Sequence, residues 1–196
     1  RTLARFAQEE LCQPLGIADF YLGIPDEVEA RIAPLRQEFD PLANANSLTR
    51  QIMPPHVTSA TVVNRPDFRR ASIPGGGGIM NARAIARHYA MLAGHGTVNG
   101  LRVLSPERID LLRTCQTTGI PSLGPPCRFG LGYQLGGATE AGGDIAMGAG
   151  GGEFGHGGNG GSLGFADPVR KLGFGLTKNL MKYDDDATQV AYIVAE

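Results

Sequence analysis

The chain has 196 residues, and its 18 basic and 19 acidic side chains leave a net charge of −1. This length fits one domain, or two small lobes that share a core. Because no basic patch stands out, a nucleic-acid partner is not expected, and because no apolar run approaches about 18 residues, no membrane span is expected.

The first third of the chain is predicted to be helical at its start and irregular afterwards. Apolar residues at helical spacing predict an amphipathic helix from Thr2 to Cys12, which a proline and a glycine within Gln13 to Gly16 end. A short apolar stretch follows from Asp19 to Ile24, and a helical turn is expected from Asp26 to Leu35. The segment from Asp40 to Ser72 contains four prolines and is predicted to be loop-like.

The middle of the chain contains the two clearest helices. Asn81 is the expected N-cap of the first helix, and Gly94 is its natural end. Its apolar face is predicted to comprise Ala82, Ile85, Ala86, Tyr89, Leu92 and Ala93. Ser105 as N-cap begins the second helix, with Pro106 at its first position and Ile109 and Leu112 facing inward.

The last third of the chain changes to a period of two, which is typical of strands. One strand is predicted across Phe129 to Leu135 and another across Leu172 to Leu176, and the turn Asp167 to Arg170 is expected to close a hairpin. Glycines on one face of these strands predict that a helix packs there at short range. A final helix is expected to begin at Asp184 and to cover the sheet with Ala187, Val190, Ala191 and Val194. The predicted class is α+β, with an antiparallel sheet and flanking helices.

The most informative stretch runs from Glu153 to Pro168, where a histidine in a strand-like segment is followed at once by two glycines. The glycines allow a ligand or another backbone to approach closely, and His156 places a titratable group beside that gap. This pattern predicts a strand that lines a hydrolase cleft; a purely structural histidine is the alternative. Of the other histidines, we expect His88 to be solvated and His95 to lie in a loop, and His56 stays ambiguous.

Several weaker patterns favour a structural interpretation. Gly160 to Gly164 matches Gly-x-Ser-x-Gly, but a strand rather than a helix is predicted after Ser162. The run Gly75 to Gly78 resembles a phosphate loop but lacks the Lys-Ser/Thr that would follow, so a turn is the better explanation. Negative charge at Asp184 to Asp186 fits a helix start better than a metal site. No cofactor or metal is predicted, and Cys12, Cys115 and Cys127 are interpreted as buried or incidental thiols.

Four groups of residues, in this order, resemble the serine β-lactamase and penicillin-binding-protein superfamily. They are Glu9-Glu10-Leu11-Cys12-Gln13-Pro14-Leu15-Gly16; Pro74-Gly75-Gly76-Gly77 with Asn81-Ala82-Arg83-Ala84-Ile85-Ala86-Arg87; Phe129-Gly130-Leu131-Gly132-Tyr133; and Phe154-Gly155-His156-Gly157-Gly158 with Gly164-Phe165-Ala166-Asp167-Pro168. The most similar branch is the class C-like group, which includes family VIII esterases and mitochondrial β-lactamase-like proteins. The resemblance implies a β-lactamase/transpeptidase-like fold and acyl transfer from a small-molecule ester, lactam or peptide to a serine.

The resemblance also implies specific site residues. Members carry Ser-x-x-Lys, then Tyr-x-Asn or Tyr-x-Ser, then a strand with Lys-Thr-Gly or His-x-Gly. Here His156, Gly157 and Gly158 align with the third motif. The backbone N–H of Asn159 would then supply an oxyanion-hole donor, and His156 would orient the substrate or polarise the site.

The sequence departs from the family pattern in its first two motifs. No serine is followed three residues later by lysine, and no tyrosine is followed two residues later by asparagine or serine. We therefore expect residues 1–196 to form a single partial domain, the C-terminal part of the fold, with a helical and loop lobe over 1–128 and strands plus a covering helix over 129–196. The isolated chain is expected to be inactive. The alternative is a non-catalytic structural or interaction module, whose strand Leu172 to Thr177 would present an open edge to a second copy or a partner chain.

Overall fold

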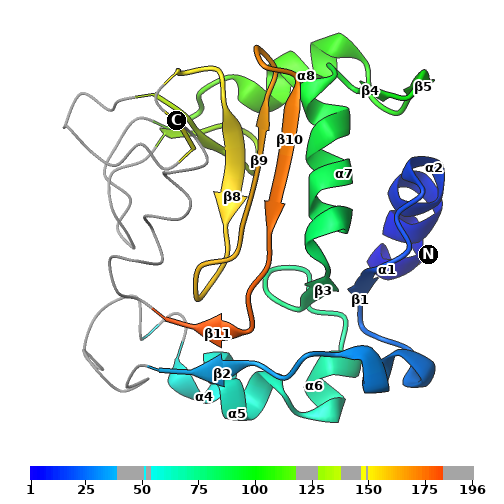
Figure 1. Ribbon diagram of the computed structural model, residues 1–196, viewed down its shortest axis with the longest axis vertical. Coiled ribbons are helices and arrows are strands. Elements are labelled where there is room, and N and C mark those ends of the chain that lie inside the picture. The colour runs from blue at the N-terminus through cyan, green and yellow to red at the C-terminus, as the bar shows by residue number, and fades with distance from the viewer. Residues whose placement is uncertain (39–50, 52–53, 118–127, 138–146, 149, 183–196) are drawn as a thin grey trace.

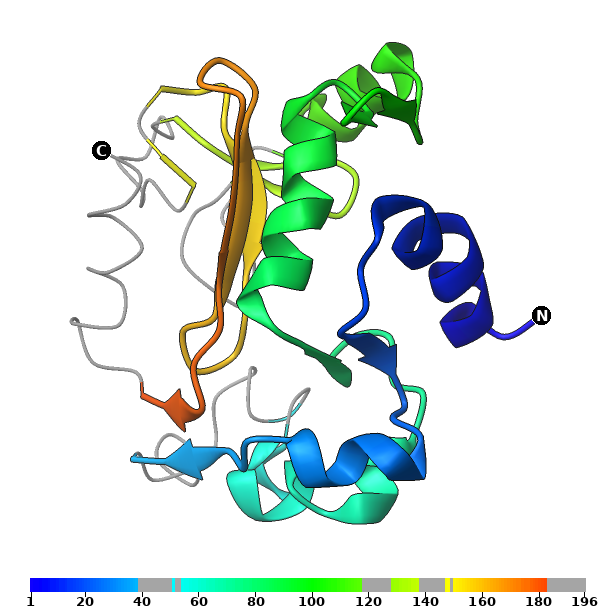
Figure 2. The same ribbon diagram turned by 45° about the vertical axis from the view of Figure 1, so that its right-hand side comes forward.

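The computed structural model describes residues 1–38, 51, 54–117, 128–137, 147–148 and 150–182. A five-stranded antiparallel sheet is the centre of this part of the chain, and one long helix packs alongside its strands (Figure 1). Figure 2 shows the sheet edge-on, with helix α7 (Ala82–Ala93) against one face and the N-terminal helical segment beyond that helix. The arrangement confirms the predicted α+β class.

The N-terminal helix is longer than predicted. α1 (Leu3–Ala7), a π-helical turn η1 (Gln8–Cys12) and α2 (Gln13–Leu15) follow one another without a break. In the widened turn Gln13 donates its N–H to Gln8 O, five residues back. The helix then continues through Pro14 to Leu15. Gly16 ends the helix in a left-handed conformation with φ of 62°.

The segment predicted to be loop-like over Asp40 to Ser72 contains three short helices, so that prediction was wrong for its described part. These are α4 (Pro55–Thr58), α5 (Ala60–Val63) and α6 (Pro66–Arg70). Two of the prolines begin helices instead of breaking them, because the first helical position needs no N–H donor. The predicted helical turn near Asp26 is confirmed as the 3₁₀ helix η2 (Asp26–Arg31). Arg69 of α6 pairs with Glu29 of η2 at 2.6 Å.

Three two-stranded pairs connect the remaining segments. β1 (Phe20–Leu22) pairs antiparallel with β3 (Gly78–Met80), so the poly-glycine run ends in a strand. β2 (Arg36–Gln37) pairs in parallel with β11 (Leu180–Met181), and β4 (Thr97–Val98) forms a hairpin with β5 (Leu101–Arg102).

Both predicted central helices are confirmed with their caps. The side chain of Asn81 accepts the N–H of Ala84 at 2.9 Å at the start of α7. The Ser105 hydroxyl accepts the N–H of Arg108 at 3.3 Å at the start of α8 (Pro106–Arg113), whose Ile109 is fully buried.

The main sheet has the order β10-β9-β8-β7-β6. Its members are β6 (Arg128–Phe129), β7 (Gln134–Leu135), β8 (Phe154–Gly157), β9 (Leu163–Asp167) and β10 (Leu172–Leu176). The predicted hairpin between β9 and β10 is confirmed. The single strand predicted across Phe129 to Leu135 is wrong: the chain reverses at Leu131 and Gly132, where φ is 83°, so β6 and β7 form a tight hairpin.

The predicted close packing of a helix on strand glycines is confirmed. Gly164, Gly173 and Gly175 face α7, and a Cβ built on Gly173 would lie 2.5 Å from Ala90 Cα. Only glycine allows the helix to lie this close to β9 and β10. The main core fills the space between α7, α8, the sheet and the N-terminal helix, and a smaller cluster of Met147, Leu163 and Phe165 lies apart from it.

β10 is the last strand of the described sheet on its side, so within the described residues its outer edge has no strand partner. The final helix predicted from Asp184 lies outside the described residues. Within the described part of the chain, no helix combines the length and apolar character needed to cross a bilayer.

Candidate active-site strand

The strand that carries His156 changes from buried to exposed along its length. Phe154 and Gly155 are buried, whereas His156 and Gly157 are exposed at the end of β8. The ring centroid of His156 lies 6.1 Å from that of Phe129. β8 therefore joins the core at one end and presents a polar, titratable side chain at the other.

The imidazole of His156 is oriented by its own strand. Its Nδ1 lies 2.6 Å from the carbonyl oxygen of Gly157. A carbonyl oxygen only accepts hydrogen bonds, so in the neutral ring this contact assigns the proton to Nδ1 and makes Nε2 the acceptor.

A tight glycine turn follows the strand. Gly158 donates its N–H to Ser162 O at 2.7 Å, and Gly161 donates to Gly158 O at 3.1 Å. Gly160 and Gly161 have φ of 84° and 99°, which favours glycine at both positions. Asn159 is exposed in this turn, and among the described residues its backbone N–H has no acceptor. The sequence-predicted residues His156, Gly157, Gly158 and Asn159 thus form one continuous exposed end of the hairpin.

Ser162 does not occupy a nucleophile elbow. It lies in the turn between β8 and β9, and its hydroxyl accepts the N–H of Lys178 at 3.4 Å. The elbow needs a strand followed by a helix, and here a second strand follows.

His88 is half-buried with its ring turned into the protein, contrary to the prediction of a solvated side chain. Its Nε2 lies 3.3 Å from the Tyr133 hydroxyl, and its Nδ1 is buried without a hydrogen-bond partner among the described residues. Burial lowers the pKa of His88 to about 4, so the ring is neutral at pH 7. The spacing argument failed because Tyr133, in the β6–β7 hairpin, contacts both His88 and Tyr89 of α7. His95 is exposed in a loop as predicted, and the side chain of His56 lies outside the described residues.

Two of the cysteines fall in the described part of the chain, and both are free thiols. Cys12 is fully buried, as predicted, and burial raises its pKa. The Cys115 thiol lies 3.1 Å from Thr117 O. Cys127 lies outside the described residues. In the described ranges, no three His, Cys, Asp or Glu side chains gather in a way that could hold a metal ion.

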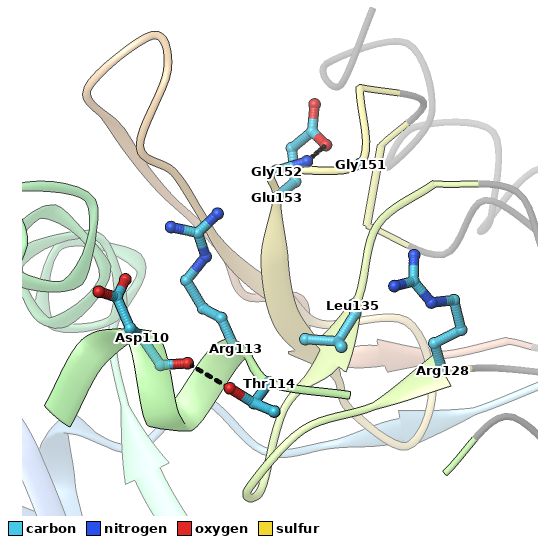
Figure 3. Close-up of a pocket in the computed structure, with 8 residues that line it drawn as sticks. All are labelled: Asp110, Arg113, Thr114, Arg128, Leu135, Gly151, Gly152 and Glu153. Atoms are coloured by element: carbon cyan, nitrogen blue, oxygen red, sulfur yellow. Dashed lines mark hydrogen bonds between the residues drawn. The ribbon is translucent and has the colours of Figure 1, made fainter. Parts of the chain in front are cut away.

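A pocket of about 240 Å³ lies at the start of β8, where Gly151, Gly152 and Glu153 line it (Figure 3). Arg113 and Arg128 stand on its two sides, with Asp110 beside Arg113 and with Glu153 preceding β8. Its two basic and two acidic side chains balance in charge, and none of the predicted site residues lines it. The exposed end of β8 is therefore the better candidate site on chemical grounds.

Comparison with known proteins identifies the fold. A family model described as Beta-lactamase matches residues 1–196. The chain belongs to the beta-lactamase family. The superfamily predicted from the four motif groups is confirmed.

Three relatives illustrate where this beta-lactamase-family chain belongs. It is 28% identical to a family VIII carboxylesterase of known structure, with a TM-score of 0.85, over 100% of this chain and 51% of that one. It is 26% identical to a penicillin-binding-protein homologue from Caulobacter crescentus, with a TM-score of 0.74, over 99% of this chain and 52% of that one. It is 30% identical over 159 residues to Esterase/beta-lactamase LipL of Mycobacterium tuberculosis (strain ATCC 25618 / H37Rv). The matched region covers 72% of this chain and 37% of LipL. The chain thus spans about half the length of the two solved structures and about a third of LipL.

Sequence reasoning missed one residue that contacts the candidate site of this beta-lactamase-family chain. Gln134, in β7, accepts the N–H of Gly157 through its side-chain Oε1 at 3.1 Å. It is 23 residues away in the chain, and it occupied an ordinary polar position of a predicted strand. No local signal in the sequence distinguishes it.

Proposed function

We propose that this chain carries the third-motif strand of a β-lactamase-related serine hydrolase, which transfers an acyl group from an ester, amide or lactam to a serine and then to water. The observation that supports this most directly is the exposed His156 at the end of a strand that is otherwise buried. In this proposal residues 1–196 form one partial domain, with a helical and loop lobe over 1–128 and the strands after it.

Each exposed residue has a chemical role in the proposal. The backbone N–H of Asn159 supplies an oxyanion-hole donor, which stabilises the negative charge that develops on the substrate oxygen. His156, with Nε2 as the acceptor, orients the substrate or polarises the site. Gly157 and Gly158 let a small-molecule ester, lactam or peptide lie against the backbone, because they have no Cβ.

The nucleophile is expected from outside these residues. No Ser-x-x-Lys and no Tyr-x-Asn or Tyr-x-Ser occurs among the 196 residues. Removing the nucleophile of a serine hydrolase costs orders of magnitude in rate and leaves only binding and oxyanion contributions. The isolated chain should therefore hydrolyse nitrocefin and p-nitrophenyl butyrate at rates near background.

The test compares two histidine variants in the protein translated from the complete reading frame. His156→Asn should lower kcat/KM for whichever of the two substrates is turned over by at least about tenfold. His95→Asn is the matched control, because His95 is exposed in a loop with φ of 52°, which asparagine tolerates. Equal rates for His156→Asn and the unchanged protein would contradict the proposed role.

One observation favours the second candidate, a non-catalytic interaction module. β10 ends the described sheet with an edge that no other described strand pairs. An open edge of this kind can pair with a second copy or with a partner chain. If the complete protein lacks a serine nucleophile and hydrolyses neither substrate, the module becomes the better proposal.

A further inference from the structure

The strand that carries the candidate site extends beyond its neighbour. β8 has four residues and β7 has two. Gln134 pairs with Gly155 and Leu135 pairs with Phe154, so the register leaves His156 and Gly157 without a main-chain partner in β7. The β6–β7 hairpin causes this, because Gly130 donates its N–H to Tyr133 O at 2.9 Å and turns the chain away at that point.

The side chain of Gln134 takes the place of the missing strand. Alternate N–H groups of a β-strand point to the same neighbour, so the N–H of Gly157 points to the same side as that of Gly155. There it meets Oε1 of Gln134 at 3.1 Å. One amide side chain thus continues the hydrogen-bond ladder past the end of β7.

The hydrogen bond holds Gly157 on the side that β7 leaves open, whereas on its other side Gly157 lies opposite Leu163 of β9. Gly157 is exposed and is followed by a second glycine, and glycine has the largest range of backbone conformations. The carbonyl of Gly157 is also the group that lies 2.6 Å from His156 Nδ1. If the Gly157 peptide turned, the imidazole would lose its partner and the chain would approach Asn159 in a different direction.

We propose that Gln134 is a positioning residue for the candidate site. It holds the Gly157 backbone, and through it the tautomer of His156 and the direction of the Asn159 N–H. This inference rests on the proposed function for its catalytic consequence, but its structural part can be measured without any activity.

The test uses two substitutions of similar shape in the protein translated from the complete reading frame. Gln134→Met removes the strong acceptor and keeps the length of the side chain, whereas Gln134→Glu keeps an acceptor oxygen. Gln116→Met is the control, because Gln116 is exposed and its side-chain amide donates to Thr114 O, two residues away, and not to the candidate site. The readouts are amide hydrogen exchange at Gly157, kcat and KM, and the thermal midpoint.

In Gln134→Met the amide of Gly157 should exchange about tenfold faster, and kcat should fall roughly five- to tenfold with KM nearly unchanged, as expected for one lost hydrogen bond. Gln134→Glu should restore both, and Gln116→Met should change neither. Unchanged exchange at Gly157 in Gln134→Met would overturn the proposal. If Gln134→Met speeds exchange at Gly157 but leaves kcat unchanged, while His156→Asn lowers kcat, the catalytic part of the inference is overturned. If His156→Asn also has no effect on kcat, the proposed function itself has failed.

Discussion

Arg170 donates from Nη1 to Oδ2 of Asp167 across 2.8 Å, and the same nitrogen lies 3.5 Å from Oε1 of Glu153. Both carboxylate side chains are buried, at 3% and 4% exposure, whereas Arg170 is 57% exposed. The arginine therefore ties the β9–β10 turn to the residue that precedes β8. This contact holds the three strands together at the end opposite the candidate site.

Asp167→Asn is expected to destabilise the protein by about 1–3 kcal/mol at pH 7, because a buried charge-assisted hydrogen bond is lost. Burial alone would raise the pKa of Asp167, but hydrogen bonds from Arg170 and from the N–H groups of Arg170 and Val169 outweigh it and lower the pKa. A carboxyl group whose pKa is lowered by folding stabilises the folded state at pH values above its ordinary pKa. This stabilisation is lost as the pH falls through the pKa of the folded state. The difference between variant and parent in urea unfolding should thus shrink below about pH 4.

The control for this prediction is Asp67→Asn, because Asp67 forms an exposed ion pair with Arg65. It should leave the unfolding midpoint unchanged within error. If both substitutions had the same effect, the buried arrangement around Arg170 would carry no special stability.

Gly173→Ala is expected to destabilise the protein by about 1–3 kcal/mol or more, because the added methyl group would meet the backbone of α7. Gly75→Ala is the matched control, since a Cβ there has no heavy atom within 4 Å. Thermal unfolding of the two variants would test both the close helix packing and the interpretation of the poly-glycine run as a turn. A tolerated alanine at Gly173 would contradict the first.

His88 is expected to make the fold sensitive to mild acid. Its pKa is lowered by burial to about 4 from 6.5, so the folded state binds its proton less readily than the unfolded chain does. The free energy of unfolding is therefore unaffected by His88 above pH 6.5. It decreases as the pH falls towards 4, by up to about 3 kcal/mol. His88→Gln stays neutral and should flatten this part of the stability curve in urea titrations at several pH values, whereas His95→Asn should not. Parallel curves for the His88 variant and its parent would rule out His88 as the source.

The outer edge of β10 is expected to cause self-association of the 196-residue chain. Leu172 is 39% exposed on this last strand of the described sheet. Leu172→Lys should lower the apparent mass in light scattering, because a lysine on an edge strand disfavours strand pairing. Leu111→Lys, on α8 and 47% exposed, should not change it. A parent chain that is monodisperse as a monomer would contradict the expectation.

The helices with strong local signals could be predicted from the chain alone. Asn81 and Ser105 cap their helices by hydrogen bonds to residues three positions away, and the β9–β10 turn closes over four residues, so the interactions that define them are encoded locally. The glycines of β9 and β10 also indicated a closely packed helix, because glycine within a strand often marks a place where another backbone approaches closely. Four groups of residues in the right order, the last of them around His156, were together sufficient to indicate the family.

Contacts between distant segments decided the rest. Tyr133 and His88 are 45 residues apart in the chain, and their contact in the folded protein helps to bury the imidazole. Gln134 reaches Gly157 because the β6–β7 hairpin stops short of the end of β8, which alternation of apolar residues cannot reveal. Hydrophobic periodicity reports which faces of an element are buried, but not which partner covers them or where a neighbouring strand ends. The burial of His88 and the support of the candidate site by Gln134 therefore followed only from the tertiary structure.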